Sequence, residues 1–347
     1  MSAEPILKSF GAQFDSDTLI HYGDAQKELD ALTTGAGLFC QGPQPFTLEG
    51  EDVQRWCNGM LSNNIRKLQP LQGNRNAVCT PKGMLEGLLH VFCLSADKFL
   101  CLPDGIDSDW FGQRFRQFLF LDDIELEPLE DHCTISLMGP KATEVALKLG
   151  YTTPEDGQQL MALGDDHWGA FGTRFGQDCV DIVCPIHQLE SLIQKAIANG
   201  AQLTGNAAMT HHRIQSGAAA WPTDKYSEKP LIHALRLNHE CCAFDKGCYV
   251  GQEVINRIDV KGILGRQLQI LKLSGPVPAG THLIDPAKDK ILAPLTSIST
   301  LGEPIGLAVL PKAYWAAGTA LSLEGTGETA TVMAHPSSSQ ESATPAD

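Results

Sequence analysis

One eight-residue run carries more potential chemistry than any other stretch of this chain. Residues 246–253 read KGCYVGQE, which places an ammonium, a thiol, a phenol, an amide and a carboxylate close together. The two glycines of the run allow the backbone to bend sharply or to approach a bound molecule closely. Arg257 follows four residues later and adds a guanidinium. We therefore expect the functional site in this segment.

Cys248 is the candidate reactive group of the run. A thiol acts as a nucleophile or metal ligand in its thiolate form, and a neighbouring cation lowers its pKa toward that form. Lys246 can supply this cation, because Gly247 lets the chain fold back between the two side chains. The alternative is that Cys248 is a small buried apolar residue, as free cysteines commonly are. The flanking residues favour the functional role, with Cys248 and Lys246 as catalytic candidates.

The other polar residues of the run each have two possible roles. Lys246 and Arg257 suit an anionic ligand, or they are solvated surface charges. Gln252 and Glu253 touch a ligand or satisfy buried backbone groups. Tyr249 is expected to be at least partly a core aromatic residue whose hydroxyl finds a partner.

Composition limits the classes of function that the chain can have. It has 347 residues, enough for two or three domains, and a formal net charge of −15. This charge argues against duplex nucleic acid as a partner, because phosphate binding needs clustered Lys and Arg. Apolar residues nowhere run for the roughly 20 positions that span a bilayer, and residues 1–17 have no signal or transit character. We expect a cytoplasmic protein that binds neither nucleic acid nor membrane.

The cysteines predict neither a disulfide framework nor a metal site. There are 11 of them, spread through apparent strands, without a Cys-x-x-Cys pair or a His/Cys set at zinc spacing. In a cytosolic chain this pattern indicates reduced thiols. No long heptad or exposed apolar stripe is evident, so we expect a monomer.

The elements that position these residues are of mixed type. Apolar residues at three- and four-residue spacing predict helices at 24–34, 51–60, 141–149 and 187–199. Strands alternate with them without a regular parallel repeat, which indicates an α+β fold. After Gly262, short strands predict a small antiparallel barrel at 267–273, 282–284, 305–310, 320–323 and 329–333. The predicted units are 1–130, 131–260 and 261–333, followed by a disordered tail at 334–347.

Several motifs carry a family resemblance that spans residues 23–323. They are DKGCYVGQEVINR (245–257), GMLSNNIRKLQPLQG (59–73), PKGMLEGLLHVF (81–92), SLMGPKA (136–142), HHRIQSG (211–217) and LTSISTLGEPIGLAVL (295–310). With these motifs the chain resembles the YgfZ family. Its members are folate-binding proteins related to the glycine-cleavage T-protein, and they act in iron–sulfur cluster assembly or repair.

The resemblance implies an architecture, a cofactor and partners. The architecture is a three-lobed ring of two ferredoxin-like α/β lobes and a C-terminal antiparallel β-barrel around a central channel. The channel would hold tetrahydrofolate, and the partners would be iron–sulfur cluster assembly proteins or their client enzymes. Eight positions match cofactor-binding positions of the family: Asn63, Arg213, Gln215, Tyr249, Gly251, Gln252, Glu253 and Arg257.

Departures from the T-protein pattern leave the activity open. The strand carboxylate of the aminomethyl-transferring enzymes aligns with Gly87, and an Asp that is usual in the family is replaced by Asn64. Gln215 replaces a glutamate that grips the pterin edge, and an amide cannot match a two-point carboxylate contact. The leading hypothesis is a folate-binding accessory protein of iron–sulfur cluster maturation. The alternatives are a tetrahydrofolate-dependent aminomethyl or one-carbon transferase, and an interaction module without folate.

Overall fold

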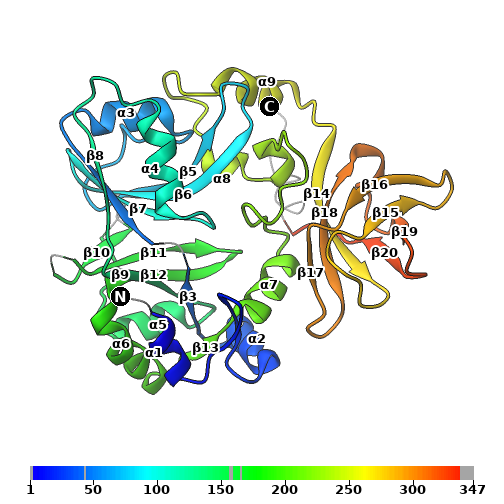
Figure 1. Cartoon of the computed structure of the whole chain (residues 1–347), viewed down its shortest axis with the longest axis horizontal. Coiled ribbons are helices and arrows are strands. Elements are labelled where there is room, and N and C mark those ends of the chain that lie inside the picture. Colours follow the sequence, from blue (N-terminus) through cyan, green and yellow to red (C-terminus); the bar gives the residue numbers. More distant parts are fainter. Residues whose placement is uncertain (1–2, 43, 156–158, 165, 337–347) are drawn as a thin grey trace.

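The computed structural model describes residues 3–42, 44–155, 159–164 and 166–336, and these ranges form three large sheets with helices between them (Figure 1). A five-stranded and a six-stranded sheet lie on one side of the molecule, and a seven-stranded sheet lies on the other. A helix, α1 (Glu4–Ser9), and a small hairpin, β1 (Gln13–Asp15) with β2 (Thr18–His21), begin the chain. The prediction of a mixed fold of helices and sheets is confirmed.

The five-stranded sheet is antiparallel and has one face covered by helices. Its strands run in the order β5-β6-β7-β4-β8. Apolar side chains of α3 and α4, among them Trp56 and Phe111, pack on that face with Phe46 and Leu89 of the sheet. The elements are β4 (Phe46–Glu49), α3 (Val53–Met60), β5 (Gly73–Cys79), β6 (Leu85–Ser95), β7 (Lys98–Pro103), α4 (Ser108–Arg116) and β8 (Glu125–Pro128).

The six-stranded sheet combines strands from distant parts of the chain, in the order β10-β11-β12-β9-β3-β13. Among its described strands, β13 and β3 pair in parallel and the other pairs are antiparallel. The elements are α2 (Ala25–Thr34), β3 (Gly37–Gln41), β9 (His132–Met138), α5 (Ala142–Lys148), β10 (Leu160–Ala162), β11 (Trp168–Arg174), β12 (Gln177–Pro185), α6 (Ile186–Ala198) and β13 (Gln202–Thr204). Phe92 and Leu102 of the five-stranded sheet pack against Trp168 and Val183 of this one, so the two sheets share a core.

This topology differs from the predicted division into residues 1–130 and 131–260. Strand β3 belongs to the six-stranded sheet, where its partner is β9. Leu7 and Leu38 accordingly lie in the same core as Ile135 and Val180. Residues 3–41 therefore pack with the second predicted unit, and β3 finds there the neighbouring strands that satisfy its backbone groups.

The C-terminal sheet is curled but open. Its seven strands run in the order β16-β15-β19-β20-β14-β18-β17, a half-barrel whose described end strands, β16 and β17, are not paired with each other. The elements are β14 (Arg266–Leu273), β15 (His282–Asp285), β16 (Lys290–Pro294), β17 (Ser297–Ser299), β18 (Ile305–Pro311), η2 (Lys312–Tyr314), β19 (Ala320–Leu323) and β20 (Thr329–Val332). The predicted barrel is thus confirmed as a curled antiparallel sheet, and the three-lobed ring around a channel stays a prediction.

A segment with little sheet structure links the six-stranded sheet to the half-barrel. It comprises α7 (Asn206–Gln215), η1 (Ile232–Leu235), α8 (Asn238–Cys241) and α9 (Gln252–Lys261). Leu235 and Tyr249 of this segment share a core with Leu88 of the five-stranded sheet and Leu268 of the half-barrel. The predicted second unit therefore ends in a linker that packs between the five-stranded sheet and the half-barrel.

The C-terminal tail and the question of membrane-spanning helices are the two remaining points of the prediction. The predicted disordered tail, 334–347, lies outside the described residues from 337 onward, and within the described part His335 contacts the Gly217 carbonyl at 3.1 Å. Among the described helices, none is both long and apolar enough to cross a membrane.

Candidate functional site

Two adjoining cavities lie where the five-stranded sheet, the six-stranded sheet and the linking segment meet. Their volumes are about 270 and about 430 Å³. Five residues, Arg75, His90, Thr173, Arg174 and Glu240, line both, so the two cavities adjoin at these side chains. We call the two together the inter-sheet cavity.

Two arginines, Arg75 and Arg174, line both parts of the inter-sheet cavity. Arg75 of β5 donates from Nη1 to Glu240 Oε2 at 2.9 Å and also pairs with Asp104. Arg174 of β11 donates to Asp181 Oδ2 on β12 at 2.8 Å. Burial acts against both charges, yet the neighbouring carboxylates raise the pKa of each arginine above its usual value. Both guanidinium groups are therefore charged at neutral pH.

The same cavity holds a donor without a partner, a neutral imidazole and aromatic faces. The Nε–H of Arg75 is buried and has no acceptor within the described chain. Burial, with Arg75 and Arg174 nearby, lowers the pKa of His90 to about 4, so its ring is neutral at pH 7. Phe92 and Phe171 also line the wall. Fixed cations beside aromatic faces suit a flat, polar, aromatic ligand with an anionic part.

We call residues 246–253 the signature run. They lie in the irregular stretch between α8 and α9, which we call the signature loop, and in the first turn of α9. The anchor of the signature loop is Lys246, whose ammonium donates to the carbonyls of Leu61 at 2.7 Å and Asn63 at 2.6 Å and lies 4.8 Å from the centre of the Tyr249 ring. Burial lowers the pKa of Lys246 to about 8. The lysine therefore fastens the loop to the stretch that follows α3.

The described contacts of Lys246 are with the carbonyls of Leu61 and Asn63 and with the Tyr249 ring, and the expectation that Lys246 activates Cys248 stays a prediction. The charge of Lys246 acts on the buried thiols of Cys57 and Cys242. Cys248 itself is exposed to solvent, unlike the other cysteines, which are buried or half-buried. It is accessible, as the functional hypothesis requires, but it does not line the inter-sheet cavity.

Close backbone packing explains the second glycine of the run. Gly251 has φ +86°, the left-handed region that glycine adopts without strain, and it caps the N-terminus of α9. A Cβ there would lie 2.7 Å from the carbonyl oxygen of Thr80 and 3.0 Å from the Cα of Gly83. The PKG turn at 81–83 and the signature run, far apart in sequence, therefore meet through glycine.

Asn63 lies between the signature loop and the inter-sheet cavity. Its carbonyl holds Lys246, while its side-chain amide donates to the carbonyls of Arg75 at 3.0 Å and Glu240 at 3.2 Å. Arg75 and Glu240 both line the cavity. Asn63 itself is half-buried and does not line the cavity.

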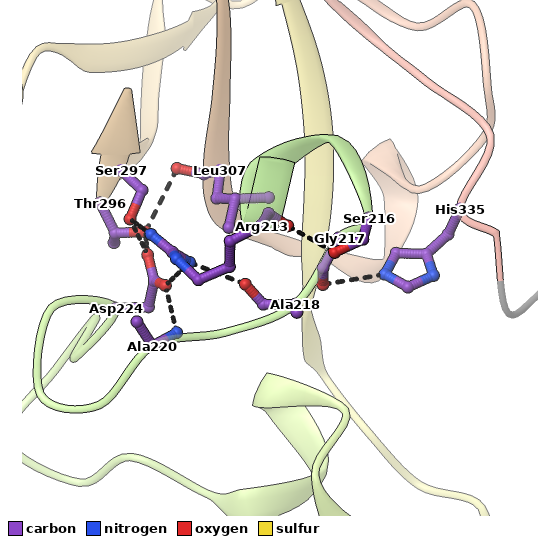
Figure 2. Close-up of polar contacts among 10 residues, drawn as sticks. All are labelled: Arg213, Ser216, Gly217, Ala218, Ala220, Asp224, Thr296, Ser297, Leu307 and His335. Atoms are coloured by element: carbon purple, nitrogen blue, oxygen red, sulfur yellow. Dashed lines mark hydrogen bonds and ion pairs between the residues drawn. The ribbon is translucent and has the colours of Figure 1, made fainter. Parts of the chain in front are cut away.

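Arg213 is the predicted cofactor-binding residue that does line the inter-sheet cavity. Figure 2 shows its guanidinium directed to Asp224 at 2.8 Å, with further bonds to the Ser297 hydroxyl at 2.7 Å and the Ala218 carbonyl at 2.7 Å. Asp224 is fully buried. The Arg213 guanidinium therefore joins α7 to the half-barrel, and it donates to acceptors of the protein itself.

The remaining predicted residues are distributed around the signature loop and α7. Gln252 donates to the Lys246 carbonyl at 3.3 Å, which satisfies the backbone, and Tyr249 is buried in the core shared with the half-barrel. Gln215, Glu253 and Arg257 are exposed and do not line the inter-sheet cavity.

Gly87, the position that aligns with the strand carboxylate of the aminomethyl-transferring enzymes, lies against an aromatic ring. A Cβ at Gly87 would lie 2.7 Å from the Trp110 ring of α4, so the position faces the helix-covered side of its sheet. The neighbouring carboxylate of Glu86 pairs with Arg114 at 2.6 Å. Neither Gly87 nor Glu86 lines the inter-sheet cavity.

Five charged or polar residues that line the inter-sheet cavity were not among the predicted site residues: Arg75, His90, Arg174, Asp181 and Glu240. His90 and Asp181 each interrupt an otherwise apolar strand, and a charged or polar residue inside such a strand is unusual unless it is paired or functional. That signal is readable in the sequence. Arg75 stands among the polar residues that begin β5 and has no such signal. Arg174 and Glu240 carry no comparable signal, since they stand at a strand end and in a short helix.

The chain matches one protein family, and it is similar to several aminomethyltransferase sequences and to one solved structure over most of its length. Residues 11–235 match the family described as the GCVT N-terminal domain. An aminomethyltransferase of Francisella tularensis subsp. mediasiatica is 22% identical over 308 residues, 84% of each chain, and one of Prosthecochloris aestuarii is 23% identical over 338 residues, 89% of each chain. The crystal structure of glycine cleavage system aminomethyltransferase T from Bartonella henselae superposes with a TM-score of 0.84 at 19% identity and covers 96% of each chain, so the fold is shared.

Proposed function

The chain belongs to the family of the GCVT N-terminal domain, and from this premise we propose that it binds tetrahydrofolate in the inter-sheet cavity and is a protein of the aminomethyltransferase type. The observation that carries the proposal is that fixed guanidinium groups and aromatic side chains line the same inter-sheet cavity. The narrower resemblance to the YgfZ family stays a prediction.

The residues of the inter-sheet cavity fit a folate. Phe92 and Phe171 give part of the wall an apolar, aromatic character that suits a pterin or benzoyl ring. The guanidinium groups of Arg174 and Arg75 line the cavity and can bind carboxylate oxygens, because guanidinium donors match carboxylates well. His90, neutral at pH 7, can donate or accept at the ring of the ligand. When bound, tetrahydrofolate would supply a nucleophilic nitrogen that carries the one-carbon group.

The relatives that we found are named aminomethyltransferases, which favours folate-dependent aminomethyl transfer over the accessory role that the sequence analysis put first. In such a reaction this chain would bind and orient the folate and exclude water. The blocked position at Gly87 means that any carboxylate contact with the ligand has to come from elsewhere. Asp104 lines the cavity, and Arg75, Arg174 and His90 lower its pKa against the opposing effect of burial, so it is ionised at neutral pH.

One observation favours the second candidate, an accessory protein of iron–sulfur cluster assembly or repair. Cys248 is exposed on an anchored loop, where a partner protein can reach its sulfur. Its partners would be cluster assembly proteins or their client enzymes. Complementation of a deletion strain tests this role: if Cys248→Ser restores the activity of iron–sulfur enzymes as well as the natural chain does, the thiol has no such role.

Calorimetric titration with tetrahydrofolate tests the folate proposal directly. We expect saturable binding with one site, and at least a tenfold higher Kd for Arg174→Gln, since one charge-assisted contact contributes about 1.5–3 kcal/mol. Arg114→Gln is the matched control, because Arg114 makes a similar ion pair away from the cavity. Absence of saturable binding refutes the proposal. Folate-dependent turnover of an aminomethyl-loaded carrier protein then separates the transferase from the accessory role.

A further inference from the structure

The signature loop and the inter-sheet cavity are separate places in the fold, yet Asn63 contacts both the loop and two residues that line the cavity. We propose that Asn63 is a positioning residue that couples occupancy of the inter-sheet cavity to the placement and reactivity of Cys248. The ligand side of this inference rests on the proposed folate binding. The anchoring of the loop by Asn63 stands on the contacts of the protein alone.

The cavity side of the link is a pair of carbonyls. The Nδ2 of Asn63 donates to the Arg75 and Glu240 carbonyls at 3.0 and 3.2 Å. The side chains of the same two residues face the cavity and bond to each other at 2.9 Å. An anionic group that binds Arg75 competes with Glu240 for the guanidinium. Such a ligand therefore changes the force on the two backbone units that Asn63 holds.

The loop side of the link is a single carbonyl. The Asn63 carbonyl accepts from Lys246 Nζ at 2.6 Å, and Lys246 stands two residues before Cys248. The Lys246 carbonyl in turn accepts from Gln252 in the first turn of α9. A rotation of the Asn63 peptide thus moves the anchor of the loop, and Cys248 lies between the two points at which the loop is held.

The chemistry of the link requires an amide at position 63. Two carbonyl oxygens face its side chain, so only a donor satisfies them, while its Oδ1 accepts from the Asn64 amide at 2.9 Å. An aspartate has the same shape but presents an acceptor to two acceptors, which breaks both bonds and adds repulsion. Asn64 offers the matched comparison. Its Oδ1 accepts from the backbone amide of Lys67, and a carboxylate oxygen at this position keeps that bond.

The test is the rate at which iodoacetamide alkylates Cys248 in the full chain, resolved by peptide mass spectrometry. We expect 5-formyltetrahydrofolate at saturation to lower the wild-type rate at least threefold. Asn63→Asp should raise the rate at least threefold without ligand and remove the ligand effect. Asn64→Asp, which adds the same charge one residue away, should behave as wild type. Asn63→Ala repeats the test if the aspartate variant does not fold.

The outcomes separate this inference from the proposed function. If calorimetry shows binding but the Cys248 rate does not change, the coupling is refuted and folate binding stands. If calorimetry shows no binding, the proposed function fails, and the ligand-free rates decide the anchor: equal rates for the Asn63 and Asn64 variants refute it. A raised rate for the Asn63 variants alone supports the anchor in either case.

Discussion

Replacement of Gly251 by alanine is the perturbation that most directly probes how the signature run is held. Two costs add. A left-handed backbone costs a residue with a Cβ about 1–2 kcal/mol, and at Gly251 the φ is +86°. The new Cβ would also lie 2.7 Å from the Thr80 carbonyl oxygen, a backbone atom that cannot rotate away. Overpacking of this kind costs about 1–3 kcal/mol. We expect a total loss of about 2–5 kcal/mol in the free energy of unfolding.

The other end of the same helix supplies the control. Gly262 has φ +60°, but its Cβ would meet no described atom within 4 Å. Gly262→Ala should therefore carry only the backbone cost of about 1–2 kcal/mol. Urea unfolding followed by tryptophan fluorescence gives both values from the shift in midpoint at unchanged slope. If Gly251→Ala is no more destabilising than Gly262→Ala, the close approach to the PKG turn is not a real constraint.

Three further predictions follow from buried charge and exposure. Asp224→Asn leaves the guanidinium of Arg213 unpaired in a buried site and should lower the free energy of unfolding by about 3 kcal/mol in urea titration; a change below about 1 kcal/mol contradicts the assigned role. The pKa of His90 is about 4, below its ordinary value, so the unfolded chain binds a proton that the native chain does not between about pH 6.5 and 4. Stability should therefore fall by up to about 3 kcal/mol as the pH drops through this window, and His90→Gln should flatten that part of the curve; an unchanged slope contradicts the shift. Cys248 should be the first of the 11 cysteines to react with iodoacetamide under native conditions, as peptide mass spectrometry can show.

Several features could be predicted from the sequence because they depend on neighbours along the chain. The helices at 25–34, 53–60, 142–148 and 186–198 follow from apolar periodicity, and most strands of the half-barrel follow from short apolar runs between turns. The sequence also singles out the signature run as the candidate functional segment, because its glycines and mixed functional groups lie within eight residues, and that role stays a prediction. The accessibility of Cys248 agrees with that interpretation.

Other features depend on which segments meet, and no local pattern encodes that. Strand β3 pairs with β9 across almost a hundred residues, so the predicted boundary at residue 130 does not describe residues 3–41. The Lys246 ammonium meets the carbonyls of Leu61 and Asn63, so it anchors the signature loop, a role that the sequence pattern did not indicate.

The sequence by itself determined the helices, the sheet-rich C-terminus and the run that carries the reactive groups, since each is set by residues close together in the chain. The tertiary structure alone decided where the cavity lies and which charges line it. Arg75, Arg174 and Glu240 come from three separate elements, and they converge only when the sheets pack. Electrostatic interactions depend on distance in space and on burial, and the folded chain fixes both.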